Sequence, residues 1–148
     1  MFISQIFLIK YKSTNTGSNA NTPAGLANVR LRNAYFDFDK SGIKKQSESE
    51  LDRIVDILAS NPDYKLVIKG HTDNLGSNSY NLDLSVRRCQ AVYDYLIGIG
   101  VPETRLAFSG FSEESPIADN SSASGRQYNR RVEFEVRLGN KVVLNSIK

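Results

Sequence analysis

The sequence predicts an α+β domain in which two helices pack on one face of a mixed sheet. Apolar residues recur at helical spacing in two separate stretches, and in several others they alternate with polar residues. These stretches follow one another in the order β-α-β-α-β-loop-β. A chain in which strands and helices interleave in this way favours a two-layer sandwich.

The first strand is expected at residues 34–38, because Phe36 and Phe38 fall on one of its faces. A helix follows. Ser47 and Glu50 have the spacing of a capping box, in which the serine oxygen accepts a backbone N–H three residues on. Asn61-Pro62 ends this helix. Its buried stripe consists of Leu51, Ile54, Val55 and Leu58.

Residues 64–70 alternate and predict a second strand that ends at Gly70. A polar loop over residues 71–78 leads into the second helix, which ends at Gly98. Residues 106–110 suggest a third strand. The buried stripe of the second helix consists of Cys89, Val92, Tyr93, Leu96 and Ile99.

A long polar loop, residues 111–129, precedes the last strand, residues 132–138, in which Val, Phe, Val and Leu alternate with charged residues. The folded domain is therefore expected over residues 30–140, with a C-terminal tail over residues 141–148. Residues 1–29 are expected to hold an apolar start and a flexible linker, since residues 13–23 have almost nothing to bury.

The apolar start, Met1 to Ile9, is far shorter than the roughly 20 residues needed to cross a bilayer. It fits a truncated targeting segment, an added strand or an artefact of where the chain was cut. The formal net charge of +3 is too small to indicate nucleic-acid binding. Cys89 is the only cysteine, which excludes an internal disulfide and a paired-cysteine zinc site.

Polar residues cluster at three places where strands end or helices begin, which is where a rigid scaffold presents side chains. Asn81, Ser85 and Arg88 are four and three residues apart and share one helix face. Asp73 lies in the loop that feeds this helix. A carboxylate and a guanidinium flanking one pocket would complement a zwitterion with an ammonium and a carboxylate on one carbon. The other cluster members are Asp39, Thr72, Arg126, Asn129, Arg130 and Arg131.

Several short motifs occur in order and at fitting spacing: Phe36–Ser41, Gly70–Asp73, Gly76, Asn81, Leu84-Ser85, Arg88, Leu96, Gly110, Pro116, Asn120, Gly125-Arg126 and Asn129–Glu133. With these motifs the sequence resembles the OmpA-like domain family, which includes the OmpA C-terminal domain, the Pal lipoprotein and the periplasmic part of the MotB stator. The resemblance covers roughly residues 31–138. One departure is Cys89, where the family usually has alanine.

The resemblance implies a β-α-β-α-β-β fold and non-covalent binding of peptidoglycan through the diaminopimelate residue of its stem peptide. Asp73 falls on the ammonium-binding aspartate and Arg88 on the carboxylate-binding arginine. The other ligand-binding candidates are Asn81, Asp39, Thr72 and Arg131. It also implies the periplasm or outer membrane of a Gram-negative bacterium, a parent protein attached to a membrane upstream and a possible homo-oligomer. No nucleic-acid partner, cofactor, metal or catalytic residue is expected.

Alternatives remain for single residues. Asp73 and Arg88 also fit a structural ion pair that ties a loop to a helix. Arg130 is interpreted as structural, Arg131 as either a pocket residue or a brace for a loop, and Asp39 as either a turn residue or a ligand contact. Ser85 is equally suited to an internal hydrogen bond.

Two other functions are kept open. In the first, the domain is the wall-binding part of a larger machine, such as a motor stator, a secretion complex or an adhesin. In the second, it is a metal-assisted murein hydrolase, for which His71 and Asp73 are the only support. His71 is the only histidine, whereas catalytic zinc usually takes three protein ligands.

Overall fold

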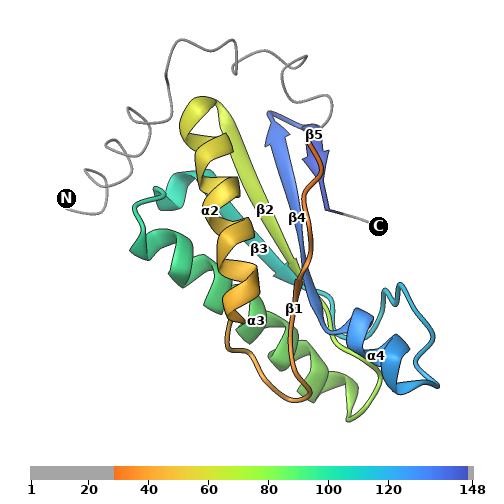
Figure 1. Ribbon diagram of the computed structural model, residues 1–148. Helices are drawn as coiled ribbons and strands as arrows, with labels where there is room; N and C mark the ends of the chain where they lie inside the picture. Colours follow the sequence, from red (N-terminus) through yellow and green to blue (C-terminus); the bar gives the residue numbers. More distant parts are fainter. Residues whose placement is uncertain (1–28, 147–148) are drawn as a thin grey trace.

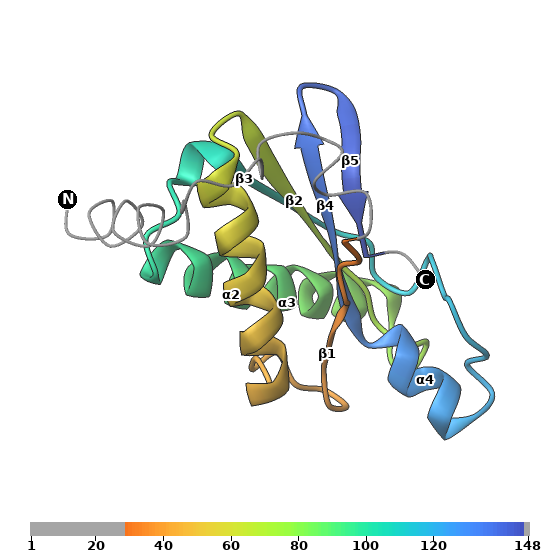
Figure 2. The same ribbon diagram turned by 45° about the horizontal axis from the view of Figure 1, so that its top comes forward.

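The computed structural model describes residues 29–146 and confirms the predicted α+β sandwich (Figure 1). Helices α2 and α3 lie on the same side of the five-stranded sheet in both views (Figures 1 and 2). The elements are β1 (Ala34–Tyr35), α2 (Lys45–Ser60), β2 (Tyr64–Gly70), α3 (Asn78–Gly98), the 3-10 helix η2 (Glu103–Arg105), β3 (Leu106–Gly110), α4 (Ala123–Asn129), β4 (Arg131–Leu138) and β5 (Lys141–Asn145).

The sheet is mixed and has the order β1-β4-β2-β3, with β5 paired to β4. Strands β2 and β3 run parallel, and α3 makes the crossover between them. All other pairs are antiparallel. Strand β2 lies in the interior of the sheet, so the loop after Gly70 begins at the C-terminal end of an interior strand and not beside an outermost one.

The core lies between the sheet and the two long helices. Leu66 and Ile68 of β2 face the same layer as Phe134 of β4, and all three are fully buried. The predicted stripe of α2 is buried, as are Cys89, Val92 and Leu96 of α3. Each fully buried aliphatic or aromatic side chain contributes about 1.5–3 kcal/mol relative to an exposed one.

Four details differ from the sequence prediction. Strand β1 covers only Ala34–Tyr35, because β4 pairs with it at two positions. Helix α2 begins at Lys45, so Ser47 lies inside its first turn and does not cap it. Glu50 instead accepts the backbone N–H of Arg32 and a hydrogen bond from Arg53. The expected loop at 111–129 contains α4.

The fourth difference concerns residues 141–148, which we expected to be a tail. Residues 141–145 form β5, which extends the sheet by pairing with the last half of β4. Gly139, with φ of +60°, makes the tight turn that returns the chain. The expected apolar start and most of the expected linker lie outside the described residues. Within residues 29–146 no helix has the length and apolar character to cross a membrane.

Gly70 lets α3 approach the end of β2 very closely. A Cβ at Gly70 would lie 2.2 Å from the backbone oxygen of Ser85 and 2.7 Å from Sγ of Cys89. We expect Gly70→Ala to lower the free energy of unfolding by about 2 kcal/mol or more, because α3 must shift away from the sheet. Urea unfolding followed by circular dichroism measures the change.

Gly42→Ala is the matched control, since a Cβ there meets nothing within 4 Å. The close-approach argument is wrong if both variants unfold at the wild-type urea concentration.

Candidate functional site

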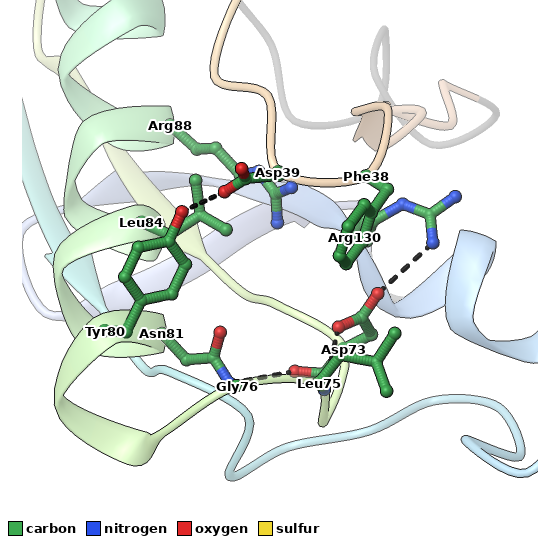
Figure 3. A pocket seen from close by; sticks show the side chains of 10 residues that line it. All are labelled: Phe38, Asp39, Asp73, Leu75, Gly76, Tyr80, Asn81, Leu84, Arg88 and Arg130. Atoms are coloured by element: carbon green, nitrogen blue, oxygen red, sulfur yellow. Dashed lines mark hydrogen bonds and ion pairs between the residues drawn. The ribbon is translucent and has the colours of Figure 1, made fainter.

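A pocket of about 210 Å³ lies where the loop after β2, the start of α3 and the loop after β1 meet (Figure 3). The loop after β2 supplies Asp73, and α3 supplies Asn81 and Arg88. The complete lining is Phe38, Asp39, Asp73, Leu75, Gly76, Tyr80, Asn81, Leu84, Arg88 and Arg130. The pocket therefore holds two carboxylates and two guanidinium groups.

Arg88 is fully buried and is held by main-chain oxygens. It donates from Nε to the carbonyl of Lys40 (2.9 Å), from Nη1 to that of His71 (2.9 Å) and from Nη2 to that of Asp37 (3.2 Å). Its guanidinium also lies 5.2 Å from the ring centroid of Phe36. A guanidinium has five N–H bonds, so these three hydrogen bonds leave two N–H groups for a ligand.

Burial is the main influence on the ionisation of Arg88. It lowers the pKa to about 10, while the nearby Asp73 carboxylate acts in the opposite direction. The side chain therefore remains a cation at neutral pH. Its charge is desolvated and is not cancelled by a direct ion pair with any described residue, which makes it a strong binding group for a carboxylate.

Asp73 is also buried, but its partner is Arg130. Oδ2 of Asp73 lies 3.2 Å from Nη1 of Arg130, and Oδ1 accepts the backbone N–H of Leu75 at 3.0 Å. The ion pair considered between Asp73 and Arg88 is absent from residues 29–146. Arg130, interpreted from the sequence as structural, lines the pocket and at the same time donates from Nε to the carbonyl of Phe36.

Asn81 is oriented by two hydrogen bonds. Its Nδ2 donates to the carbonyl of Asp73 (3.4 Å) and to Oε1 of Glu113 (3.3 Å). Its Oδ1 is thereby directed toward the open space of the pocket (Figure 3). Glu113 was not expected from the sequence, because it comes from the loop after β3 and no spacing rule connects it to Asn81.

Thr72 does not line the pocket. Its side chain is buried and donates from Oγ1 to the carbonyl of Asp73 at 2.8 Å, which braces the loop. Asp39 does line it, and its backbone has a φ of +59°, a conformation that aspartate tolerates better than most residues. The Tyr80 hydroxyl donates to Oδ1 of Asp39 across the pocket (Figure 3).

Arg131 was expected at the pocket, but the structure places it on the other face of the sheet. Val132 faces the core, so the preceding residue of β4 points away from it. Nη2 of Arg131 lies 2.7 Å from Oε2 of Glu133 and donates to the carbonyl of Ser115 at 2.9 Å. Arg131 therefore braces the loop that leads to α4. Ser85 is likewise internal, because its Oγ accepts the N–H of Ser112.

His71 lies on that same outer face and not in the pocket. It is buried, stacks on Phe111 with ring centroids 5.3 Å apart, and places Nε2 3.4 Å from Oε1 of Glu133. Among the described residues, no group of three or more His, Cys, Asp or Glu side chains is placed to hold a metal ion. The His71/Asp73 pattern therefore gives no support to a metal-assisted hydrolase in this part of the chain.

The ionisation of Glu133, which contacts His71 and Arg131, makes the stability of the fold depend on pH. Burial disfavours its charge, but His71 and Arg131 outweigh that effect and lower its pKa from 4.5 to about 2. A folded-state pKa below the unfolded value stabilises the protein above pH 4.5, and this contribution is lost as the pH falls toward 2.

We expect the wild type to lose about 2 kcal/mol of this contribution between pH 5.5 and pH 3, since each pKa unit corresponds to about 1.4 kcal/mol. Glu133→Gln should be less stable at pH 5.5 and should lack this part of the pH dependence. Urea unfolding at both pH values measures the difference between the two proteins. Glu135, whose pKa is also lowered, stays in both and cancels in the comparison. Parallel pH curves for the two proteins would contradict this assignment.

Fold and pocket together define an α+β domain with a pocket that is lined by two carboxylates and two guanidinium groups. The model of the OmpA family matches residues 35–130. Outer membrane porin F of Pseudomonas aeruginosa is 41% identical over 116 residues, which cover 77% of this chain and 33% of the porin. The chain belongs to the OmpA family, as the motifs at the pocket indicated.

Two solved structures are similar to the described fold. The peptidoglycan-associated lipoprotein from Burkholderia pseudomallei has a TM-score of 0.70 and 28% identity, covering 81% of this chain and 98% of that one. The cell wall anchor of the T6SS from Pseudomonas aeruginosa has a TM-score of 0.56 and 33% identity, covering 68% of this chain and 72% of that one.

The chain spans about a third of the length of the porins that it matches. These relatives are outer-membrane proteins and a lipoprotein of Gram-negative bacteria, which assigns the chain to the periplasm or the outer membrane.

Proposed function

We propose that this domain binds peptidoglycan non-covalently through the diaminopimelate residue of the stem peptide. The observation that carries the proposal is the joint presence of Asp73 and Arg88 in one pocket, each buried and each presented from a different element. The free end of diaminopimelate carries an ammonium and a carboxylate on one carbon, so opposite charges must face it together.

In this arrangement the ligand carboxylate accepts the two unused N–H groups of Arg88, and the carbonyls that hold Arg88 keep its position fixed. The ligand ammonium donates to Asp73, with Oδ1 of Asn81 as a second acceptor. Arg130 remains paired with Asp73 and compensates the charge of this buried carboxylate. Binding adds one charge of each sign, so the pocket stays electrically balanced.

The relatives support this proposal by their names, which describe one as peptidoglycan-associated and another as a cell wall anchor. We infer that the domain anchors an outer-membrane or envelope protein to the wall and does not catalyse a reaction. Its similarity to the T6SS wall anchor makes the wall-binding part of a larger machine the second candidate. The two roles use the same pocket and differ only in the remainder of the parent protein.

Discrimination between wall types tests the proposal. A lysine residue offers the ammonium without the adjacent carboxylate, which leaves Arg88 buried with two N–H groups unpaired. That costs on the order of 1–3 kcal/mol, or roughly 5- to 150-fold in affinity. We expect NMR titration to show tighter binding of a stem peptide that contains diaminopimelate than of the same peptide with lysine at that position, and pull-down to retain the domain preferentially on diaminopimelate-type sacculi. Equal binding of both stem peptides and of both wall types would refute the proposal.

A further inference from the structure

A pocket that recognises only the zwitterionic head group has a specificity problem. Every free α-amino acid carries the same ammonium and carboxylate on one carbon. Asp73, Asn81 and Arg88 alone would therefore bind alanine as well as diaminopimelate. What distinguishes the wall residue is the chain of methylene groups that connects its head group to the peptide. Selectivity requires a part of the site that contacts this chain.

Three apolar side chains stand at the mouth of the pocket. Phe38 is 57% exposed, Leu75 is 45% exposed and Tyr80 is 44% exposed, although all three line the cavity. They come from three different segments: the loop after β1, the loop after β2 and helix α3. In Figure 3, Tyr80 lies on one side of the pocket, and Phe38 and Leu75 lie on the opposite side, near Arg130 and Asp73. We call these three residues the rim.

Tyr80 is held in place by two contacts with neighbouring side chains. Its hydroxyl donates to Asp39, and the guanidinium of Arg87 lies 5.9 Å from its ring centroid. A side chain that is already ordered loses little rotamer entropy when a ligand contacts it. Apolar side chains gathered around one opening mark a surface that is covered when a ligand binds.

We propose that the rim is the specificity element of the site and packs against the methylene groups of the side chain that bears the zwitterion. This inference rests on the proposed function, because it requires the head group to be seated on Asp73 and Arg88. The rim then contributes affinity that grows with the length of the aliphatic chain, while the charged groups contribute a constant part.

Titration of the intact chain with D-alanine, D-norvaline and meso-diaminopimelate tests the proposal. D-norvaline has the same head group as D-alanine and two more methylene groups. We expect it to bind about fivefold more tightly, since burial of a methylene is worth a factor of roughly two to four, depending on how completely it is covered. Meso-diaminopimelate should bind at least as tightly as D-norvaline.

Leu75→Ala and Phe38→Ala should each weaken D-norvaline binding more than D-alanine binding, which reduces the ratio of the two affinities. Leu82→Ala is the matched control: Leu82 is 47% exposed on α3 but does not line the pocket. Tyr80→Phe keeps the ring and should keep the ratio. Because the substituted side chains are exposed, an unchanged amide NMR spectrum outside the pocket is expected for all four variants.

Equal affinities of D-alanine and D-norvaline for the wild type would overturn the rim proposal while leaving head-group binding intact. Rim variants that weaken both ligands by the same factor would also overturn it. Failure of the wild type to bind any of the three ligands would instead reject the proposed function, and the rim proposal with it.

Discussion

Arg88→Ala is expected to abolish retention on sacculi and to lower the free energy of unfolding by at least about 2 kcal/mol. The substitution removes the fully buried guanidinium that lines the pocket and that we propose binds the ligand carboxylate. It also leaves the carbonyls of Asp37, Lys40 and His71 without their donor. Each unsatisfied buried polar group costs about 1–3 kcal/mol, and relief of the desolvated charge offsets part of that sum.

Arg105→Ala separates the two effects. Arg105 also donates to three main-chain carbonyls, those of Leu58, Asn61 and Tyr64, but it lies away from the pocket. We expect it to lose stability and to keep full binding when folded. Urea unfolding and sacculus pull-down, performed on both variants, measure the two properties. An Arg88→Ala protein that is folded and still retained on sacculi would contradict the assigned role.

The pattern of apolar residues was sufficient to predict the sandwich. Alternation in residues 64–70 and 132–138 placed the two central strands, which β2 and β4 confirm within a residue or two. The edges were less predictable. Strand β5 has a weak pattern because both its faces are largely exposed, so its sequence resembles a tail. It pairs with β4 after the turn at Gly139, and only Val143 and Leu144 of β5 pack, partly buried, against the core.

Some residues of the site could also be predicted from the sequence, and others could not. Residues on α3 were predicted together because helical geometry fixes which side chains share a face, and Asn81 and Arg88 both line the pocket. Arg130, interpreted as structural, lines the pocket, whereas Arg131 takes the loop-bracing role and not the pocket role that was also expected of it. They are adjacent in sequence, and only the point at which β4 begins decides which of the two faces the pocket. A boundary of one residue is below what pattern analysis resolves.

Asp73→Asn is expected to weaken diaminopimelate binding by at least about 100-fold while changing stability much less than Arg88→Ala does. Asparagine keeps the size of the side chain and an oxygen that accepts the backbone N–H of Leu75. It removes the charge that faces the ligand ammonium and leaves Arg130 as an unpaired cation beside the pocket. A buried charge-assisted hydrogen bond lost in this way costs several kcal/mol of binding free energy.

Asp83→Asn is the matched control for the lost carboxylate, because Asp83 forms an exposed ion pair with Arg87 on the same helix that carries Arg88. NMR titration of both variants with diaminopimelate gives the affinities. Wild-type affinity in Asp73→Asn would exclude Asp73 as the ammonium-binding group.

Comparing two ligands across the Asp73 and Arg88 variants assigns each charge to its partner. Arg88→Ala, purified in its folded form, should lose its preference for a diaminopimelate-containing stem peptide over the matching lysine-containing peptide, because the group that detects the extra carboxylate is gone. Asp73→Asn should weaken both ligands, since both carry the ammonium. If the two variants instead weaken both ligands by the same factor, the charges act only through the shape of the pocket. Titration of Arg130→Gln with the same two ligands would then test the opposite assignment, in which the ligand carboxylate binds near Arg130.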